Sequence, residues 1–539
     1  MAIIHQTDKR SGITYAYETT YRWDPEKKQS RSKRTIIGRV DKATGEIVPT
    51  DGRMKKAKSK SETDNPVKKP GPKPVINTRH MYYGATYLLE EMSNDIGLTS
   101  DLASCFPNIY QQILSIAFYL ILEDNNPLYR FEKWHITHKH PFDEDITSPR
   151  SSELFASITD QQINQVFRLQ GRRRIKEEYW AYDSSSISSY SETLKQVQYG
   201  KNKENDKLPQ LNLLLVYGEK SGLPFYYRKL AGNIPDVKTV KHLIGELDIL
   251  GFNKTKFVMD RGFYSEANIN ELYKAHVKFL VGVRLSLKFV KQHLNDVYDD
   301  IRMFQNFMED NNTYGVTIPI EWDYSQERPY KGDIITEKRR MYLHLFYNLD
   351  KGAEEESVFD KRIAILYREL RDNNPVESHQ KDYDKYFFVK TTPKRGITVT
   401  PNDHAIREAK RYMGYFALIT NETMDAPTAL HLYRQKDVVE KAFGNIKERL
   451  NMRRLLVSSE RSLDGKLFVQ FIALILISHL YKKMKDSELI NKYSLHQLLD
   501  KLDVIECFES PRKALRIGEL LNSQIDIYEK LGVRVPSSS

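Results

Sequence analysis

The alternation of hydrophobic and polar positions divides the chain into segments of different predicted structure. Residues 1–50 alternate with a period of two, which predicts a small β unit. Residues 51–78 are rich in Lys, Ser and Pro and predict a flexible basic linker. Residues 79–177 place apolar side chains three or four positions apart, which predicts a helical domain. From Glu178 onward, short apolar runs between turns predict strands.

The strands expected after Glu178 follow a specific order. Three strands are joined by turns, and two more follow, each preceded by a helix. The predicted strands are Tyr179–Asp183, Leu211–Tyr217, Pro224–Leu230, Lys256–Asp260 and Val277–Val283, with Asp236 and Ser265 as caps of the two helices. This is the order of an RNase H-like core of mixed α/β class. We expect that core over residues 178–285 and 412–485.

Two of these strands end in an acid. Asp183 ends the first and Asp260 the fourth, and neighbouring parallel strands lie about 4.8 Å apart in such a sheet. An aspartate at a strand end usually marks only a turn or a helix cap, but the joint placement of Asp183 and Asp260 favours a shared site. Paired carboxylates can hold two divalent metal ions, and hard oxygen ligands favour Mg²⁺ or Mn²⁺.

A third acid lies on a later predicted helix, which begins at Asp425 and Pro427 after a strand at Gly414–Thr420. Four of its side chains share one stripe about 60° wide, at about 100° per residue: Tyr433, Lys436, Glu440 and Lys447. Leu432 and Val439 belong to an adjoining apolar stripe. An ordinary amphipathic surface helix explains neither the tyrosine in the polar stripe nor the two lysines near one acid.

The positive charge of the chain is concentrated at its N-terminus. The net charge is +11, and residues 1–80 hold 19 Lys and Arg against 9 Asp and Glu, a net of +10. Cations alternate with Tyr and Trp there, which favours a DNA-contacting surface over an ordinary solvated strand face.

Other classes of protein are disfavoured by what the sequence lacks. The two cysteines are too few for a disulfide framework and fit a cytoplasmic protein. No apolar run is long enough to predict a membrane segment, and Leu467–Leu480 is expected to be a buried core helix. No Walker-type phosphate loop occurs, so an ATP-driven mechanism is not expected. His135, His138 and His140 lack zinc-ligand spacing and are expected in a surface loop.

These motifs resemble the DDE transposases of bacterial insertion sequences, in the branch with a Tyr-x2-Arg-x3-Glu-x6-Lys signature. Tyr433, Glu440 and Lys447 match that spacing, while Lys436 stands where the family has Arg. The resemblance implies that Asp183, Asp260 and Glu440 are catalytic metal ligands, and that the Tyr and the cations of the stripe hold the DNA end. Further cations are expected to extend the DNA-binding surface: Arg434, Arg453 and Arg454.

The resemblance also implies the reaction and the partners. A transposase of this kind hydrolyses double-stranded DNA at terminal inverted repeats and transfers the 3′-hydroxyl ends into target DNA, here by a cut-and-paste route. Two ends must be paired, so we expect a homodimer on DNA, in the bacterial cytoplasm at the nucleoid. Two alternatives remain open: a domesticated DNA-binding protein without catalysis, and a stand-alone RNase H-like nuclease.

The spacing of the acids predicts an insertion in the core. Asp260 and Glu440 are 180 residues apart, far more than one helical crossover needs. We expect a β-rich insertion domain over residues 286–411 and a helical tail over residues 486–539. The strands expected in the insertion are Gly315–Trp322, Met341–Tyr347 and Tyr386–Thr391, with a helix over Glu354–Asp372.

Overall fold

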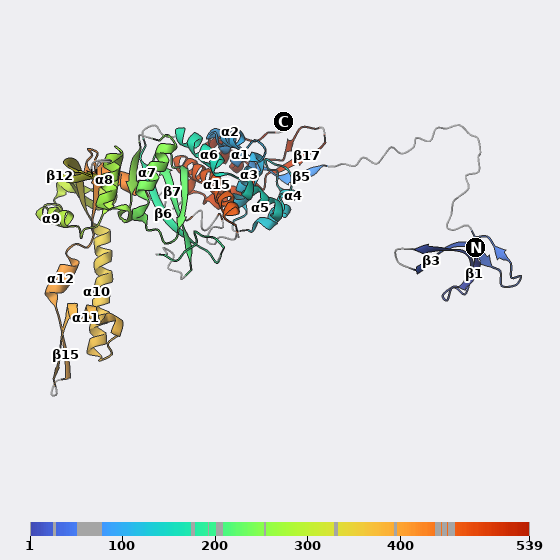
Figure 1. Ribbon diagram of the computed structural model, residues 1–539, viewed down its shortest axis with the longest axis horizontal. Coiled ribbons are helices and arrows are strands. Elements are labelled where there is room, and N and C mark those ends of the chain that lie inside the picture. Colours follow the sequence, from blue (N-terminus) through green and yellow to red (C-terminus); the bar gives the residue numbers. More distant parts are fainter. Residues whose placement is uncertain are drawn as a thin grey trace. The chain divides into compact units, whose positions relative to one another are not determined.

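The computed structural model describes most of the 539-residue chain. It describes residues 2–24, 29–50, 78–124, 126–173, 178–191, 193–200, 208–252, 255–327, 332–392, 396–436, 444, 450, 459–511 and 513–537. The predicted linker lies outside these ranges as far as Asn77. The chain forms two compact units, residues 1–75 and 76–539 (Figure 1).

The first unit contains one antiparallel sheet, as the alternation of residues 1–50 predicts. Its strands lie in chain order: β1 (Ala2–Thr7), β2 (Thr14–Asp24), β3 (Gln29–Val40) and β4 (Ile47–Val48). Among the described residues of this unit, Ala16, Thr19 and Gly38 are buried. The other side chains are exposed or half-buried, so the sheet has almost no core of its own.

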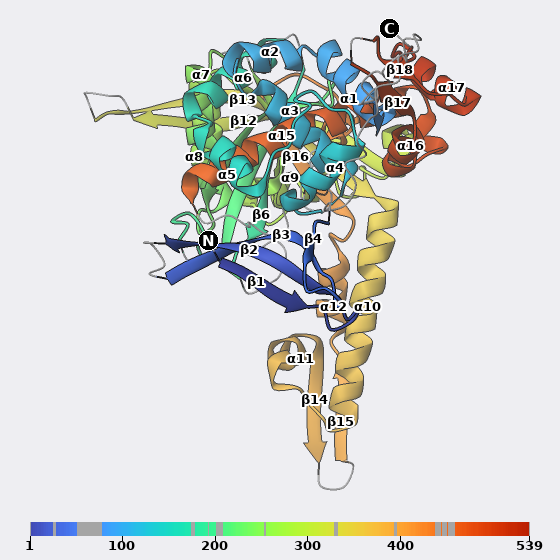
Figure 2. The same ribbon diagram turned by 90° about the vertical axis from the view of Figure 1, so that its right-hand side faces the viewer.

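A nine-stranded mixed sheet forms the centre of the second unit (Figures 1 and 2). Its strands follow the order β11-β12-β13-β16-β10-β9-β6-β7-β8. Their bounds are β6 (Trp180–Ser188), β7 (Gln210–Gly218), β8 (Pro224–Ala231), β9 (Lys256–Met259), β10 (Lys278–Val283), β11 (Phe307–Met308), β12 (Thr313–Glu327), β13 (Ile334–Asn348) and β16 (Tyr415–Thr420). β6, β7 and β8 form an antiparallel meander, and β9 lies parallel between β6 and β10. The first and fourth strands of the predicted core are therefore neighbours.

Helices cover both faces of this sheet. α7 (Val240–Ile249) precedes β9, and α8 (Glu266–Lys274) connects β9 to β10. On one face, Tyr273 of α8 packs edge-on against Phe279 of β10. On the other face, α13 (Ala426–Gln435) packs with Val258 and Leu280 in one apolar cluster. β9 and β10 are buried on both faces, which explains why they appear in the sequence as continuous apolar runs.

The helical region before the core packs around α15 (Glu460–Asp486). Its helices are α1 (Gly84–Asp95), α2 (Leu98–Cys105), α3 (Tyr110–Leu122), α4 (Phe131–Thr137), α5 (Ser148–Ser157) and α6 (Asp160–Arg172). α15 is long and apolar enough to cross a membrane by composition, but 89% of its most apolar window is buried in the protein. Leu467–Leu480 is buried throughout, which confirms the predicted core helix.

The C-terminal residues contain strands as well as the expected helices. α16 (Leu495–Asp503) and α17 (Asn522–Lys530) are joined by a segment that contains β17 (Glu506–Glu509) and β18 (Arg516–Ile517). β17 pairs with β5 (Arg79–Tyr82), at the start of the second unit. The purely helical tail predicted for residues 486–539 is therefore corrected. Short strands of this kind obtain their partner from a distant segment, which local periodicity does not show.

The histidines expected in a surface loop are largely buried. His138 and His140 are 7% and 2% exposed, and His140 Nε2 lies 2.9 Å from His135 Nδ1. Burial, together with the charge of His135, lowers the pKa of His140 to about 3. The surface-loop prediction was wrong for His138 and His140, because both rings stack on Trp134.

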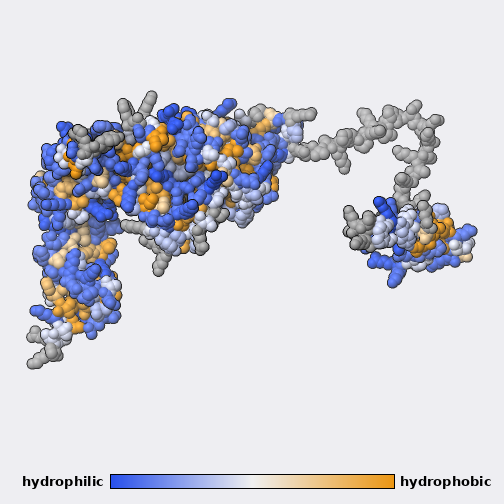
Figure 3. Space-filling view, viewed as in Figure 1, coloured by the Kyte–Doolittle hydropathy of each residue, from blue (hydrophilic) through white to orange (hydrophobic). Residues whose placement is uncertain are grey.

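The segment between β13 and β16 forms an arm that projects from the sheet (Figures 1 and 2). It consists of α10 (Leu349–Arg371), α11 (Gln380–Tyr386), β14 (Phe387–Thr392), β15 (Gly396–Pro401) and α12 (Asp403–Lys410). A small core that includes Leu366 and Tyr383 holds it together. Apolar side chains such as Val358 and Phe388 stay exposed on the arm, which shows hydrophobic patches in Figure 3.

The strands predicted for the insertion are present, but two of them belong to the central sheet. Gly315–Trp322 and Met341–Tyr347 lie within β12 and β13, and β13 pairs with β16 of the core. The predicted helix Glu354–Asp372 lies within the longer α10 apart from its final residue. The central sheet thus continues past the core strands, and the arm is attached to its extension.

Candidate active site

Asp183 and Asp260 lie on adjacent strands. In the parallel ladder of β6 and β9, Tyr182 pairs with Met259, so the two aspartates are the next residues in register. Registered residues of neighbouring strands point to the same face. That face carries Val258, which packs with α13. The strand order thus brings the two predicted acids together on the side of the sheet that α13 covers.

The position of Asp183 within its strand differs from the prediction. β6 does not end at Asp183 but continues to Ser188, which pairs with Gln210 of β7. Ser184, Ser185 and Ser186, which follow Asp183, are buried, and Ser186 Oγ donates a hydrogen bond to Asn212 Oδ1 at 3.3 Å. Strand β9, in contrast, ends at Met259. Asp183 therefore lies in mid-strand, beside the point where the neighbouring strand stops.

Asp236 has a different role from the predicted helix cap. Thr239 occupies the N-cap position of α7, and the carboxylate of Asp236 instead accepts a hydrogen bond of 2.5 Å from Ser184 Oγ. Ser184 follows Asp183 directly, and its amide donates to Asp183 Oδ1 at 2.8 Å. Asp236 thus holds the side chain of Ser184, which is the residue next to Asp183.

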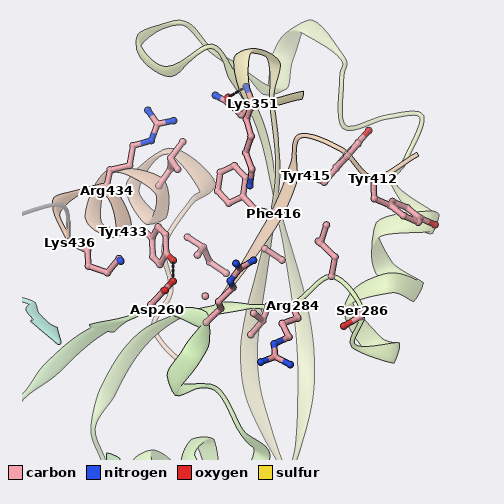
Figure 4. A pocket seen from close by; sticks show the side chains of 18 of the residues that line it. Asp260, Arg284, Ser286, Lys351, Tyr412, Tyr415, Phe416, Tyr433, Arg434 and Lys436 are labelled. Carbon is pink, nitrogen blue, oxygen red and sulfur yellow. Dashed lines mark hydrogen bonds between the residues drawn. The ribbon is translucent and has the colours of Figure 1, made fainter. Parts of the chain in front are cut away.

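Asp260 is held as a carboxylate by its neighbours. Burial by itself raises its pKa, but the charge of Lys436 and a hydrogen bond from Tyr433 outweigh burial and bring the pKa below the ordinary value. Tyr433 Oη donates to Asp260 Oδ1 at 2.7 Å (Figure 4). Burial and the charge of Asp260 in turn raise the pKa of Tyr433, so its hydroxyl stays protonated. At neutral pH this pair consists of an ionised acid and a neutral donor.

Gly282 leaves the space that this contact needs. It follows Val281, which pairs with Met259, so it lies beside Asp260 in register on β10. A Cβ atom at Gly282 would lie 2.9 Å from Tyr433 Oη and 3.0 Å from the backbone nitrogen of Arg261. Gly282 was not predicted as a site residue, although a glycine inside a buried strand often marks a close approach of another group.

The helix that carries Tyr433 begins as predicted. Asp425 is the N-cap of α13 and accepts a hydrogen bond from the Thr428 amide at 2.9 Å. Lys436, just past the helix end, is 5% exposed, and its Nζ lies 5.8 Å from the centroid of the Tyr433 ring. Tyr433 and Lys436 thus lie on one side, as their spacing predicts. Four other predicted site residues lie outside the described part of the chain: Glu440, Lys447, Arg453 and Arg454.

A cavity of about 660 Å³ opens beside Asp260 (Figure 4). Its cationic lining residues are Arg261, Arg284, Lys351, Arg434 and Lys436. Aromatic rings form another part of its wall, and Phe416 lies under Lys351 with Nζ 5.4 Å from the ring centroid. Arg434 is oriented by a hydrogen bond to Asn311. This combination of cations and rings beside a carboxylate can accommodate a nucleic-acid strand.

Three cationic residues of the cavity were not found from the sequence: Arg261, Arg284 and Lys351. Arg284 directly follows β10, and Arg261 is the second residue after β9, so both cations lie at the same sheet edge as Asp260. The positions of Arg261 and Arg284 just after predicted strands were a usable signal for both residues. Lys351 gave no such signal, because the first turn of α10 reaches the cavity only through the extension of the sheet.

The acids fit hard divalent cations. Asp183 and Asp260 provide carboxylate oxygens from adjacent register positions, and the lowered pKa of Asp260 keeps it ionised. Within the described part of the chain, no group of three acidic, His or Cys side chains is assembled as a metal site. Asp183 and Asp260 are therefore the two predicted metal ligands in the described part of the chain. The third predicted ligand, Glu440, lies outside it.

Comparison with known proteins identifies the family to which the chain is similar. A family model for the transposase DDE domain matches residues 174–476, more than half of the chain. Among solved structures, a piggyBac transposase synaptic complex with hairpin DNA is similar at 11% identity with a TM-score of 0.35, over 78% of this chain and 76% of that chain. No curated protein matches the chain.

Proposed function

The chain belongs to the transposase DDE domain family, and we propose that it cuts DNA at the terminal inverted repeats of its own element and joins the freed 3′-hydroxyl ends to target DNA. Asp183, Asp260 and Glu440 are the proposed catalytic acids and the ligands of two Mg²⁺ or Mn²⁺ ions. The observation that carries the proposal is the register of β6 and β9, which places Asp183 beside Asp260 on one sheet face.

The side chains around the acids support this chemistry. Bound divalent ions would activate water or a 3′-hydroxyl and stabilise the leaving oxygen. Tyr433 and Lys436 keep Asp260 ionised and oriented. Arg261, Arg284 and Lys351 line the adjoining cavity and supply positive charge for DNA phosphates.

The proposal extends to the wider assignment. The order of β8, β7, β6, β9 and β10 supports an RNase H-like core, and the segment from Asp260 to Glu440 supports an insertion in it. We assign the protein to the bacterial Tyr-Arg-Glu-Lys branch, acting in the cytoplasm by a cut-and-paste route, as a homodimer on DNA and without ATP. The proposed DNA-holding residues are Tyr433, Arg434, Lys436, Lys447, Arg453 and Arg454.

The test is cleavage of a labelled duplex that carries the DNA flanking the gene. With Mg²⁺, the wild-type protein is expected to release 3′-hydroxyl ends and to join them to a plasmid, and EDTA should abolish both products. Asp260→Asn and Glu440→Gln should lose cleavage while still binding the duplex. Glu266→Gln is the matched control, because Glu266 is an exposed acid in the first turn of α8. Cleavage by Asp260→Asn at the rate of Glu266→Gln would reject the proposed site.

A further inference from the structure

Part of the N-terminal sheet is only two strands wide. β1 pairs with β2 as far as Thr19, and β4 pairs with β3 only at Arg39 and Val40. Beyond these positions β2 and β3 continue as a pair, over residues 20–24 and 29–34. This segment, the β2–β3 ribbon, carries four cations and one acid. Its charge is therefore higher than that of the sheet from which it extends.

The register sorts the side chains of the β2–β3 ribbon onto two different faces. Arg22 lies opposite Arg31, and Lys33 lies opposite Thr20 on the same face. The other face carries Tyr21 and Trp23, which are 63% and 62% exposed, together with Arg34 opposite Thr19. The sequence predicts one surface on which cations and rings are mixed. In the ribbon, alternation instead separates a basic face (Arg22, Arg31 and Lys33) from an aromatic face.

Two acids of the unit are held at the opposite end of the long strands, whereas Asp24 lies in the ribbon opposite Gln29, in the same alternation as Arg22. Asp8 accepts a hydrogen bond from the Arg10 amide at 2.9 Å, and Asp41 accepts one from the Ala43 amide at 2.8 Å. These bonds fix both carboxylates in their own turns and lower their pKa values. Glu18 is on the basic face but lies where the ribbon joins the four-stranded sheet, opposite Thr35. The basic face thus projects away from the acidic turns.

The two-strand width and the positive charge of the ribbon match duplex DNA. The major groove of B-DNA admits a two-stranded β-ribbon, and arginine pairs there with guanine through two hydrogen bonds. We propose that the β2–β3 ribbon lies in the major groove of duplex DNA with its basic face toward the bases and phosphates. The aromatic face then points away from the groove. This inference rests on the proposed function only in taking the element's own DNA as the partner.

The test compares the two faces in the full-length protein. Arg22→Gln/Arg31→Gln/Lys33→Gln removes the basic face, and Arg34→Gln is a matched control that removes a cation of the same ribbon from the other face. Binding to a labelled duplex from the DNA flanking the gene is measured by fluorescence anisotropy over a range of salt, without divalent metal. The triple variant is expected to lose about tenfold or more in affinity, and its log–log salt slope should fall by about 2 to 3, since each phosphate contact contributes about 0.9. Arg34→Gln should change affinity by less than about twofold.

A conservative variant separates base contacts from general charge. Arg22→Lys/Arg31→Lys keeps both charges but loses the planar fork of the guanidinium. It should retain affinity for a scrambled duplex and lose the preference for the flanking DNA. Circular dichroism should show unchanged folding in every variant, since the replaced side chains are exposed.

Three results would overturn the inference. Per cation removed, Arg34→Gln could weaken binding as much as the triple variant does, which would mean that the two faces are equivalent. Tyr21→Ser/Trp23→Ser could abolish binding to the separated single strands while the triple variant binds the duplex normally, which would assign the contact to the aromatic face. The triple variant could also bind as the wild type does. Each result is independent of catalysis, because binding is measured without divalent metal.

Discussion

The hydroxyl of Tyr433 donates a hydrogen bond of 2.7 Å to Asp260, and this bond joins α13 to the end of β9. Tyr433 lies seven residues before Glu440, the third acid of the proposed triad. Helix α13, which precedes Glu440 in the chain, is therefore bonded directly to Asp260, the second acid of the proposed triad. The tyrosine, which the family resemblance assigns to DNA holding, also positions a carboxylate of the proposed triad in this structure.

Tyr433→Phe tests this positioning. The variant loses the hydrogen bond to Asp260 and retains the ring, so the fold should be kept. Cleavage of the end duplex should fall by about tenfold to a hundredfold, because hydrogen bonds to charged groups contribute about 1.5–3 kcal/mol. Binding without metal is the control readout. Loss of binding in proportion to cleavage would indicate that the hydroxyl acts on DNA alone.

Lys436→Gln tests whether the charge of Lys436 lowers the pKa of Asp260 against the effect of burial. The pKa of Asp260 is lowered in the folded protein, so its contribution to stability is full above the unfolded value of 3.8 and is lost as the pH falls through the lower folded value. Removing Lys436 should raise the pKa of Asp260, and the acid limb of the cleavage profile should move to higher pH. Lys436→Arg keeps the charge and should leave that limb in place. If the acid limb of the cleavage profile lay at the same pH in Lys436→Gln and Lys436→Arg, the proposed effect of the Lys436 charge on the pKa of Asp260 would be wrong.

Gly282→Ala tests the space between Asp260 and Tyr433. The new Cβ would lie 2.9 Å from Tyr433 Oη, so the ring or the strand must shift. Cleavage should fall by about tenfold or more, because a misplaced catalytic group loses its alignment. Gly245→Ala is the matched control, since nothing lies within 4 Å of its new Cβ in α7. That control should keep full activity and gain about 0.5–1 kcal/mol of stability.

Gln470→Leu tests the hydrogen bond that holds Leu450, ten residues after Glu440. Gln470 of α15 is 1% exposed, and its Nε2 donates to the carbonyl oxygen of Leu450 at 2.6 Å. Without this donor a buried carbonyl loses its partner, so the free energy of unfolding should fall by about 1–3 kcal/mol. Cleavage should fall as well. The exposed Gln161→Leu should change neither, and an unchanged melting temperature in Gln470→Leu would show that Leu450 finds another donor.

Several parts of the fold could be predicted because their signals are local. Asp425 and Ser265 cap their helices as expected, since a capping side chain needs only its own first turn. The strand order around Asp260 followed from the sequence of apolar runs and turns. The positions of Tyr433 and Lys436 followed from helical spacing.

Other parts depended on partners distant in the sequence. Strand β6 extends past Asp183 because β7 pairs with it as far as Gln210, and the β6 segment by itself does not show that partner. β12 and β13 extend the central sheet because β16 pairs with β13. Asp236 does not cap α7 but accepts a hydrogen bond from Ser184, which lies 52 positions earlier in the chain.

The sequence by itself determined which chemical groups the protein has, and in what local setting. It determined the two strand acids, the stripe of Tyr433 and Lys436, and the basic N-terminus, because these depend on residue type and on periods of two or 3.6. Only the tertiary structure decided that Tyr433 bonds to Asp260, that Gly282 leaves room for it, and that the basic and aromatic side chains of the ribbon face opposite ways. Those relations depend on the register between strands and on close packing, and no single segment of the chain contains that information.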